Sequence, residues 1–346
     1  MYKENKQSVI DLRSDTLTKP TPEMLEFMMK AEVGDDVYKE DPTVNELENR
    51  IADYFGMDAA LYFPTGSMTN QAAIKIHTQP GEQLIADKYA HIYNYEGGGV
   101  SFNSGVSCKL IDGDRGMITA KRVEESINSP DFYHSPLTSL VCLENTTNKG
   151  GGACYDIDEV FAIKEVCNKH KLGFHLDGAR LWNALVATNQ NSKTYGQAFD
   201  TISVCLSKGL GAPMGSVLVG KKEFMDKAIR VRKILGGGMR QMGYMAAAGL
   251  YALDHYPDIL GEDHKKAREL GSLLVTTKGV KNVEEVETNI VIFYLEESAE
   301  GKLFMNLLRD NNILYSDMGG GKLRLVTHYD YTAQKHLKFL KLLREF

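Results

Sequence analysis

The sequence predicts an α/β fold, with a large domain built on a mostly parallel sheet covered by helices and a smaller C-terminal α+β domain. From residue 59 to about residue 253, short and almost continuously apolar segments alternate with helical segments, which is typical of strands buried on both faces. After Pro257 the pattern changes to helix, strand, helix, strand and helix. A chain of 346 residues is also too long for one small core. We therefore place the large domain at 1–255 and the small domain at 256–346.

Two helices are expected before the sheet begins. Thr21 followed by Pro22 is typical of an N-cap and a first helical residue. Thr43 and Glu46 have the spacing of a capping box, for a helix that Gly56 ends. Strands are then expected at 59–63, 106–111, 137–143, 172–176, 202–207 and 217–219, and helices at 67–76, from 119, and at 156–169, 224–234 and 244–253. The small domain is expected to hold helices at 262–276, 300–309 and 332–344 and strands at 290–294 and 322–326.

Composition argues against several classes of partner. The net charge is −6 and no basic run occurs, so neither nucleic acid nor an anionic membrane is expected as the main partner. The five cysteines are odd in number and widely spaced, which indicates buried thiols in a reducing compartment and predicts neither disulfides nor a metal site. No segment approaches membrane-spanning length, and residues 1–6 lack the apolar core of a signal peptide. We expect a cytoplasmic protein.

Two charged residues stand at the ends of predicted strands. Lys208 follows the apolar run 202–207 and precedes a glycine-rich turn, a setting that desolvates the ammonium and favours the neutral amine needed for a Schiff base. Asp177 ends the strand at 172–176. Pyridoxal 5'-phosphate (PLP) requires this pair, because a lysine binds its aldehyde and an aspartate keeps its pyridine nitrogen protonated. Singly, the two are an ordinary loop lysine and turn aspartate; together they predict that the large domain binds PLP.

Other residues suit the same cofactor. Thr65 and Ser67 lie where a strand meets a helix, and their hydroxyls and the free N–H groups of the helix start suit a phosphate, although a plain helix cap is the alternative. His91 begins a predicted helix and is either a surface residue or the flat group stacked on the cofactor ring. Tyr95 shares its face one turn later.

Two arginines suggest an anionic substrate. Arg180 lies in the turn after Asp177, and Arg324 lies within the strand at 322–326. A guanidinium binds a carboxylate through two parallel hydrogen bonds, which suits the α-carboxylate of an amino acid. An ordinary salt bridge is the alternative for each.

The chain resembles the low-specificity threonine aldolases, PLP enzymes of fold type I with the aspartate aminotransferase superfold. The resemblance covers nearly the whole chain. It rests on DLRSDT at 11–16, VGDDVY at 33–38, EDPTVNELE at 40–48, DGAR at 177–180, LSKGL at 206–210, GGGMRQ at 236–241 and RLVTH at 324–328.

The resemblance implies a seven-stranded sheet, a homotetramer with shared active sites and a set of residue roles. Lys208 would bind the cofactor covalently, Asp177 would hold the pyridine nitrogen and His91 would stack on the ring. The remaining cofactor contacts would come from Thr65, Gly66, Ser67, Arg180 and Arg240. The amino-acid substrate would meet Ser14, Arg180, Arg324, Tyr95 and Thr147. Arg240 or Tyr38 would reach the site from a neighbouring subunit.

One position departs from the family. Its members commonly have a histidine in the run that reads ENTTN at 144–148 here, so Thr147 replaces a group that contacts the substrate β-hydroxyl. A threonine cannot act as a base near neutral pH. The resemblance implies an aldolase that cleaves threonine or allo-threonine into glycine and an aldehyde. Alternatives are a β-eliminating lyase or a phenylserine-type aldolase on the same scaffold and, less favoured, a silent PLP-binding protein.

Overall fold

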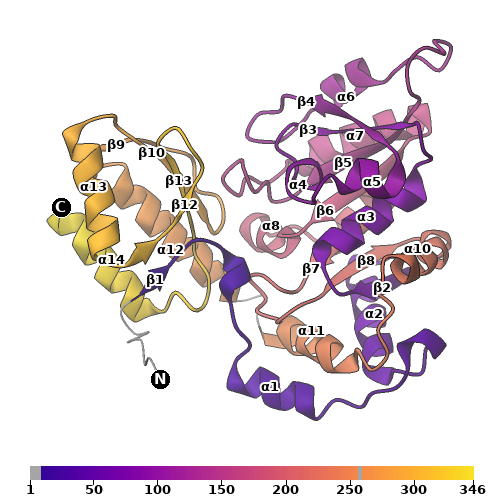
Figure 1. The fold of residues 1–346 in the computed structure, drawn as a ribbon, viewed down its shortest axis with the longest axis horizontal. Coiled ribbons are helices and arrows are strands. Elements are labelled where there is room, and N and C mark those ends of the chain that lie inside the picture. Colours follow the sequence, from indigo (N-terminus) through magenta and orange to yellow (C-terminus); the bar gives the residue numbers. More distant parts are fainter. Residues whose placement is uncertain (1–8, 256–258) are drawn as a thin grey trace.

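The computed structural model describes residues 9–255 and 259–346 (Figure 1). Its larger part surrounds a seven-stranded sheet in the order β2-β8-β7-β6-β5-β3-β4. Only β8 runs opposite to the other six strands, which confirms the predicted mostly parallel sheet. The strands are β2 (Ala59–Phe63), β3 (Gln83–Asp87), β4 (Ser107–Ile111), β5 (Thr138–Glu144), β6 (Gly173–Gly178), β7 (Thr201–Cys205) and β8 (Ser216–Gly220).

Helices cover both faces of this sheet (Figure 1). They are α1 (Pro22–Met29), α2 (Pro42–Phe55), α3 (Gly66–His77), α4 (His91–Asn94), α5 (Gly99–Ser104), α6 (Ala120–Ser126), α7 (Ile157–His170), α8 (Leu181–Thr188), α9 (Ser192–Ala198), α10 (Lys222–Ile234) and α11 (Gly243–His255). Successive strand residues enter different cores. Tyr62 packs in the core that includes α2 and α7, whereas Leu61 and Phe63 pack with α3 and α10. Burial on both faces explains why the strands are apolar along their length.

The helix starts agree with the sequence in one case and differ in another. Thr21 caps α1 as predicted, and its hydroxyl accepts the N–H of Met24. The predicted capping box at Thr43 is wrong, because α2 begins earlier: Asp41 is its N-cap and accepts the N–H of Val44 at 3.0 Å. The carboxylate of Asp41 and the fixed φ of the following proline define the start more strongly than a hydroxyl inside the first turn.

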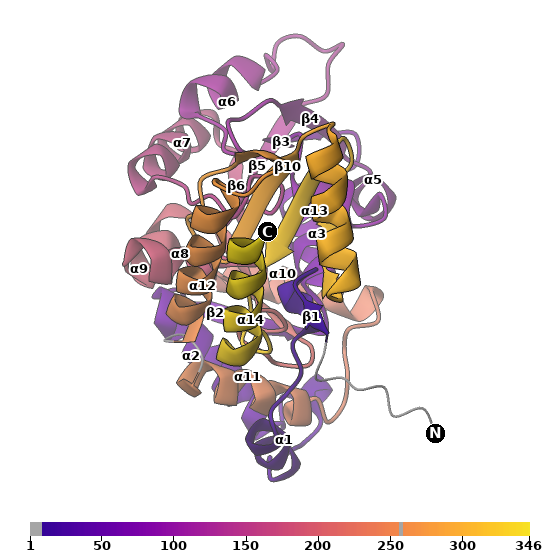
Figure 2. The ribbon, with the colours of Figure 1, turned by 90° about the vertical axis from the view of Figure 1, so that its left-hand side faces the viewer.

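The smaller part is a four-stranded antiparallel sheet with three helices, and Figure 2 views the molecule from this side. In order across the sheet, the strands are β12 (Ser316–Asp317), β13 (Lys322–Val326), β10 (Ile290–Leu295) and β9 (Val280–Val283). The helices are α12 (Ile259–Leu274), α13 (Ala299–Asp310) and α14 (Ala333–Glu345). The proposed boundary at 255/256 adjoins residues 256–258, which lie outside the described residues.

The N-terminal segment packs on the small part, whereas the predicted boundary assigns it to the large domain. Strand β1 (Ile10–Asp11) pairs in parallel with β11 (Ile313–Leu314). Ile10 and Leu12 are buried in the core that α12, α13 and α14 share, because that core offers these side chains an apolar surface and a strand edge. Across the described ranges, no helix is both long and apolar enough to span a bilayer.

Candidate active site

The predicted cofactor residues meet at one edge of the large sheet. Asp177 lies near the end of β6 and Lys208 follows β7, the neighbouring parallel strand, so both leave the sheet at the carboxyl ends of the strands. Lys208 Nζ lies 3.5 Å from Cys205 Sγ, and the Thr18 hydroxyl donates to the Lys208 carbonyl at 2.9 Å. Parallel α/β sheets commonly bind their ligands at this edge.

Asp177 has one oxygen that the described chain leaves without a partner. Its side chain is 2 % exposed. Its Oδ1 accepts the N–H of Ala179 at 3.1 Å, while its Oδ2 is buried and has no hydrogen-bond partner. A buried carboxylate oxygen without a donor is costly, so the site lacks a proton-bearing group here. A protonated pyridine nitrogen would meet this requirement, so the residues fit PLP.

His91 begins α4, as predicted, and is held at both its backbone and its ring. Its N–H donates to Glu144 Oε2 at 2.8 Å, and its Nδ1 lies 3.1 Å from Glu96 Oε1. Burial lowers the pKa of the imidazole, but the hydrogen bond to Glu96 and the charges of Asp177, Glu96 and Glu144 outweigh it, so the pKa is raised. The Tyr95 ring lies 5.5 Å from the His91 ring, centroid to centroid.

His91, Glu96 and Asp177 also form a set of possible metal ligands, with one atom from each within 4.8 Å of the others. Glu96 is already occupied, because it accepts hydrogen bonds from Asn70 at 2.9 Å and Gln71 at 2.6 Å as well as from His91. This arrangement orients an imidazole beside a carboxylate, which suits an aromatic cofactor better than a cation.

The residues predicted to bind the phosphate lie at the start of α3. Thr65 is the N-cap of α3, and its hydroxyl accepts the N–H of Met68 at 3.2 Å. A Cβ added at Gly66 would lie 2.6 Å from Cys205 Sγ. Glycine therefore lets the helix start approach β7 next to Lys208, and Ser67 follows it, half-buried.

The two predicted carboxylate-binding arginines have different surroundings. Arg180 is buried and forms a two-pronged ion pair with Asp15, with Nε–Oδ2 at 2.8 Å and Nη2–Oδ1 at 2.6 Å. Arg324 forms no ion pair within the described ranges. Its Nη1 donates to Asn148 Oδ1 at 2.6 Å, its Nη2 donates to the Arg13 carbonyl at 3.2 Å and to Ser316 Oγ at 3.5 Å, and its Nε is buried without a partner. Burial and the charge of Arg180 lower the pKa of Arg324 to about 10. Arg324 is therefore the cation with capacity for a further anion.

The other predicted substrate residues lie at or near this edge. Ser14 precedes Asp15, and its hydroxyl accepts the N–H of Thr16 at 3.2 Å. Lys149 Nζ stands 5.4 Å from the centre of the Tyr95 ring. Thr147 is 3 % exposed, and its Oγ1 has no partner in the described chain. A Cβ added at Gly116 would lie 3.3 Å from Thr147 Cβ, so this side chain packs against the turn at 113–117.

Arg240 and Tyr38 are not brought to this edge by any contact within the described chain. Arg240 Nη1 pairs with Asp35 Oδ2 at 2.7 Å and its side chain is 53 % exposed, while Tyr38 is 70 % exposed.

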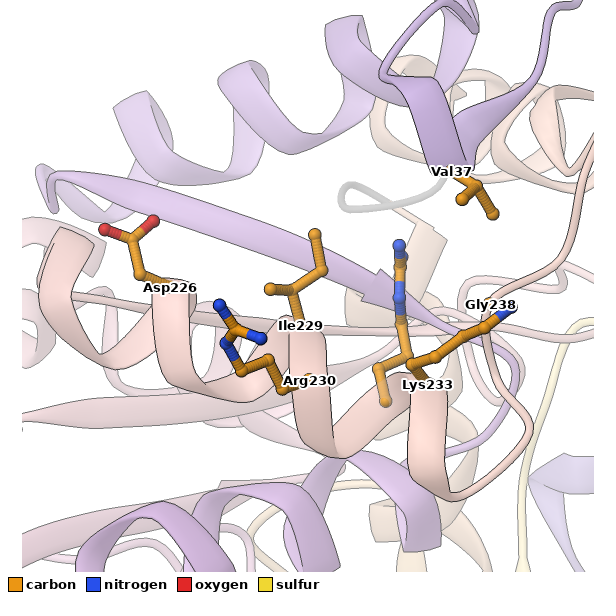
Figure 3. A pocket seen from close by; sticks show the side chains of 7 residues that line it. Val37, Asp226, Ile229, Arg230, Lys233 and Gly238 are labelled. Atoms are coloured by element: carbon orange, nitrogen blue, oxygen red, sulfur yellow. The ribbon is translucent and has the colours of Figure 1, made fainter.

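A pocket of about 500 Å³ lies along α10 (Figure 3). Two of its lining residues, Val37 and Gly238, are close in sequence to Tyr38 and Arg240. Its lining residues are Val37, Asp226, Ile229, Arg230, Arg232, Lys233 and Gly238. No residue predicted for the site lines this pocket.

Four residues of the site were not assigned roles from the sequence: Asp15, Glu96, Glu144 and Asn148. Glu144 ends β5 and is the Cα partner of Asp177. Burial and then the charge of Asp177 raise the pKa of Glu144 to about 7, although the N–H groups of Asn148 and His91 and the His91 charge act against them. A carboxylate at a strand end was a signal that the sequence offered.

Comparisons with known proteins agree with this geometry. A family profile described as beta-eliminating lyase matches residues 11–298. Low-specificity L-threonine aldolase 1 of Arabidopsis thaliana is 41 % identical over 333 residues, which cover 94 % of this chain and 92 % of the relative. A Leishmania major threonine aldolase structure superposes with a TM-score of 0.84 at 21 % identity, covering 97 % of this chain and 99 % of that one. A structure of SPT with PLP superposes with a TM-score of 0.75 at 17 % identity, covering 97 % and 87 %. The chain therefore belongs to the beta-eliminating lyase family, in the group of the low-specificity L-threonine aldolases.

Proposed function

We propose that this protein is a PLP-dependent aldolase that cleaves β-hydroxy-α-amino acids, threonine or allo-threonine, into glycine and an aldehyde. The observation that carries the proposal is that Lys208 and Asp177 lie at one edge of the large sheet and that Arg324 contacts Asn148 of the same site from β13, with an unpartnered oxygen on Asp177 and an unpartnered Nε on Arg324. The aldolase names of relatives about 40 % identical over nearly the whole chain support it.

The cofactor would be held by residues from several elements. Lys208 would provide the amine that binds it covalently, Asp177 would accept a hydrogen bond from its protonated pyridine nitrogen, and His91 would cover its ring. Thr65, Gly66 and Ser67 offer N–H groups and hydroxyls at the start of α3 for its phosphate. When bound, PLP supplies an electron sink for the carbanion that is left when the bond between Cα and Cβ breaks.

The substrate carboxylate would bind Arg324, with Ser14 beside it. Arg180 would act on this position indirectly, because its two-pronged pair with Asp15 and its contact with Asn148 use most of its donors. Asn148 Oδ1 accepts from both arginines, from Arg180 at 3.4 Å and from Arg324 at 2.6 Å. The positive charge of the pair of arginines attracts the carboxylate, while Asp15 fixes the geometry.

The proton of the substrate β-hydroxyl needs an acceptor, and Thr147 cannot be that base near neutral pH. His91 is the titratable group that we assign to the face of the ring, and its pKa is raised despite its burial, by the hydrogen bond to Glu96 and the charge of Asp177. We assign the proton to His91 or to a water that it orders.

The test is a product assay on threonine, allo-threonine, phenylserine and serine. Glycine plus an aldehyde supports the aldolase. Ammonia plus a keto acid would support a β-eliminating lyase on the same scaffold. PLP absorbance without turnover of any of the four would support a silent binding protein.

We also propose a cytoplasmic homotetramer in which Arg240 or Tyr38 completes a neighbouring site. Both side chains are exposed, and Ile234, near Arg240 in sequence, is 81 % exposed. The five cysteines are all unpaired, which suits a reducing compartment. Mixing inactive Lys208→Ala and Arg240→Ala subunits should restore part of the activity if sites are shared, whereas no recovery in mixed oligomers would contradict it.

A further inference from the structure

The carboxylate of Glu144 joins two loops of the active site. Its Oε2 accepts the N–H of His91 and its Oε1 accepts the N–H of Asn148, both at 2.8 Å. The side chain is 9 % exposed and stands beside Asp177, its partner on the neighbouring strand. One buried group therefore determines both where α4 begins and how the loop after β5 leaves the sheet.

The first of these loops presents the group that covers the cofactor ring. Glu144 holds the backbone of His91, and Glu96 holds its ring at 3.1 Å. The N-cap residue of α4, Ala90, makes no side-chain hydrogen bond to the helix. The first N–H of α4, that of His91, is instead bound by the side chain of Glu144. A shift of this N–H would move the imidazole relative to Asp177.

The second loop shapes the carboxylate site. Asn148 Oδ1 accepts from Arg324 Nη1 at 2.6 Å and from Arg180 Nη1 at 3.4 Å. The backbone of Asn148 is fixed by Glu144, so the side chain that orients both guanidinium groups depends on the same carboxylate. Glu144 itself touches neither arginine through a hydrogen bond.

We propose that Glu144 is a positioning residue that couples the cofactor-ring position to the substrate-carboxylate position, acting through His91 and Asn148. The inference rests on the proposed function of this site. A glutamine at 144 has one oxygen to accept one N–H, and its amide group would face the other N–H as a second donor. Both positions are therefore expected to loosen together in Glu144→Gln.

The charge of Glu144 makes this coupling depend on pH. Asp177 faces it from β6, His91 from α4, Arg180 from the start of α8 and Tyr155 from the segment before α7. With its pKa at about 7, Glu144 is ionised above neutral pH, where both oxygens accept an N–H. Below that pH one oxygen carries a proton and the loops lose an acceptor.

Stability and organisation of the site should respond in opposite directions. The pKa of Glu144 lies above its usual 4.5, so the folded chain binds the proton more tightly than the unfolded chain. This contribution to stability is present below about pH 4.5 and is lost as the pH rises through about 7. Ligand binding should improve over the same range, whereas a purely structural acceptor would change stability without changing ligand affinity.

The experiment compares Glu144→Gln with Glu159→Gln, whose Oε1 also accepts a backbone N–H, that of Ala120 at 2.6 Å, but outside the site. PLP affinity of the cofactor-free protein, glycine affinity of the PLP-loaded protein and Tm of the cofactor-free protein are measured from pH 5.5 to 8.5. We expect Glu144→Gln to weaken both affinities by about tenfold or more at pH 8. The Tm of the wild type should fall as the pH rises through about 7, and this part of the fall should be absent in Glu144→Gln. Glu159→Gln should leave both affinities within twofold.

A double variant tests the route through Asn148. If Glu144 acts through it, Glu144→Gln/Asn148→Ala should bind glycine within about twofold of Asn148→Ala alone, whereas fully additive losses would overturn the inference. Wild-type affinities in Glu144→Gln would also overturn it. If that variant fails to fold, Glu144→Asp, which keeps the charge on a shorter arm, should weaken both affinities to a smaller degree. Glycine and PLP binding do not require turnover, so loss of both in a protein that cleaves no hydroxy amino acid would support Glu144 and refute only the aldolase.

Discussion

Arg180→Met and Arg324→Met remove the same group from two neighbouring positions, and the structure predicts opposite effects on stability. Burial alone would raise the pKa of Asp15, but the charge and hydrogen bonds of Arg180, with the charge of Lys208, hold it at about 2 against the usual 3.8. The difference corresponds to about 2.5 kcal/mol, present above pH 4 and lost as the pH falls through 2. Leaving Asp15 buried without its partner costs about 3–5 kcal/mol, so Arg180→Met should be strongly destabilised.

Arg324 has no carboxylate to lose. Its pKa of about 10, against the usual 12.5, means that holding the charge in the folded state costs roughly 3 kcal/mol at neutral pH. Methionine retains part of the apolar stem and removes this charge. The unfolding free energy of Arg324→Met should therefore equal or exceed that of wild type, by up to about 3 kcal/mol.

Glycine affinity should respond to Arg324→Met in the opposite direction from stability. Removing a buried partner of a ligand carboxylate costs about 2–5 kcal/mol, so glycine binding should weaken roughly 30- to 5,000-fold. Urea unfolding of the cofactor-free proteins and titration of PLP absorbance with glycine provide both measurements. The reasoning would be refuted if Arg324→Met lost more than about 1 kcal/mol of stability, or if it bound glycine within threefold of wild type.

Three further outcomes concern the cofactor and the proton. Borohydride reduction should fix PLP on the peptide that contains Lys208, and labelling of another lysine would contradict this assignment. Asp177→Asn should retain the cofactor but lose activity by orders of magnitude in a product assay, because an amide cannot keep the pyridine nitrogen protonated; near-native turnover would remove Asp177 from the mechanism. Thr147→His should raise threonine cleavage about 10²–10⁴-fold if a base is missing. If His91 is already the acceptor of the β-hydroxyl proton, His91→Phe should abolish cleavage and Thr147→His should change the rate little. Unchanged cleavage rates in both variants would mean that a water molecule or another side chain accepts the proton.

The elements that local pattern could predict were those with long apolar runs or clear caps. Strand β3 was missed because only Leu84, Ile85 and Ala86 lie between polar ends, and its burial comes from neighbours on both sides. Helix α8 was missed because its first five residues, Leu181 to Leu185, are all buried, so no polar stripe marks a period of 3.6 residues.

The same distinction applies to the site. Lys208 and Asp177 could be found because each ends a predicted strand. The partner of Arg180 could not, because Asp15 lies 165 residues away in sequence, and Asn148 lies 176 residues from Arg324. Glu144 was within reach of the strand-end argument that found Asp177, since it directly follows the strand predicted at 137–143 and ends β5 in the structure.

The pairing of β1 with β11 has a consequence for the order of folding during synthesis. The Ile10 N–H bonds to the Asn312 carbonyl, 302 residues later (312 − 10), and the Leu12 carbonyl accepts from Val326, 314 residues later (326 − 12). The same segment contains Asp15, which binds Arg180, and Thr18, which binds the Lys208 carbonyl. It can therefore dock only after nearly the whole chain has left the ribosome. Contacts that close such long loops form late and slowly. The large sheet can form as its strands emerge, whereas the substrate site is expected to be completed as the last step of folding.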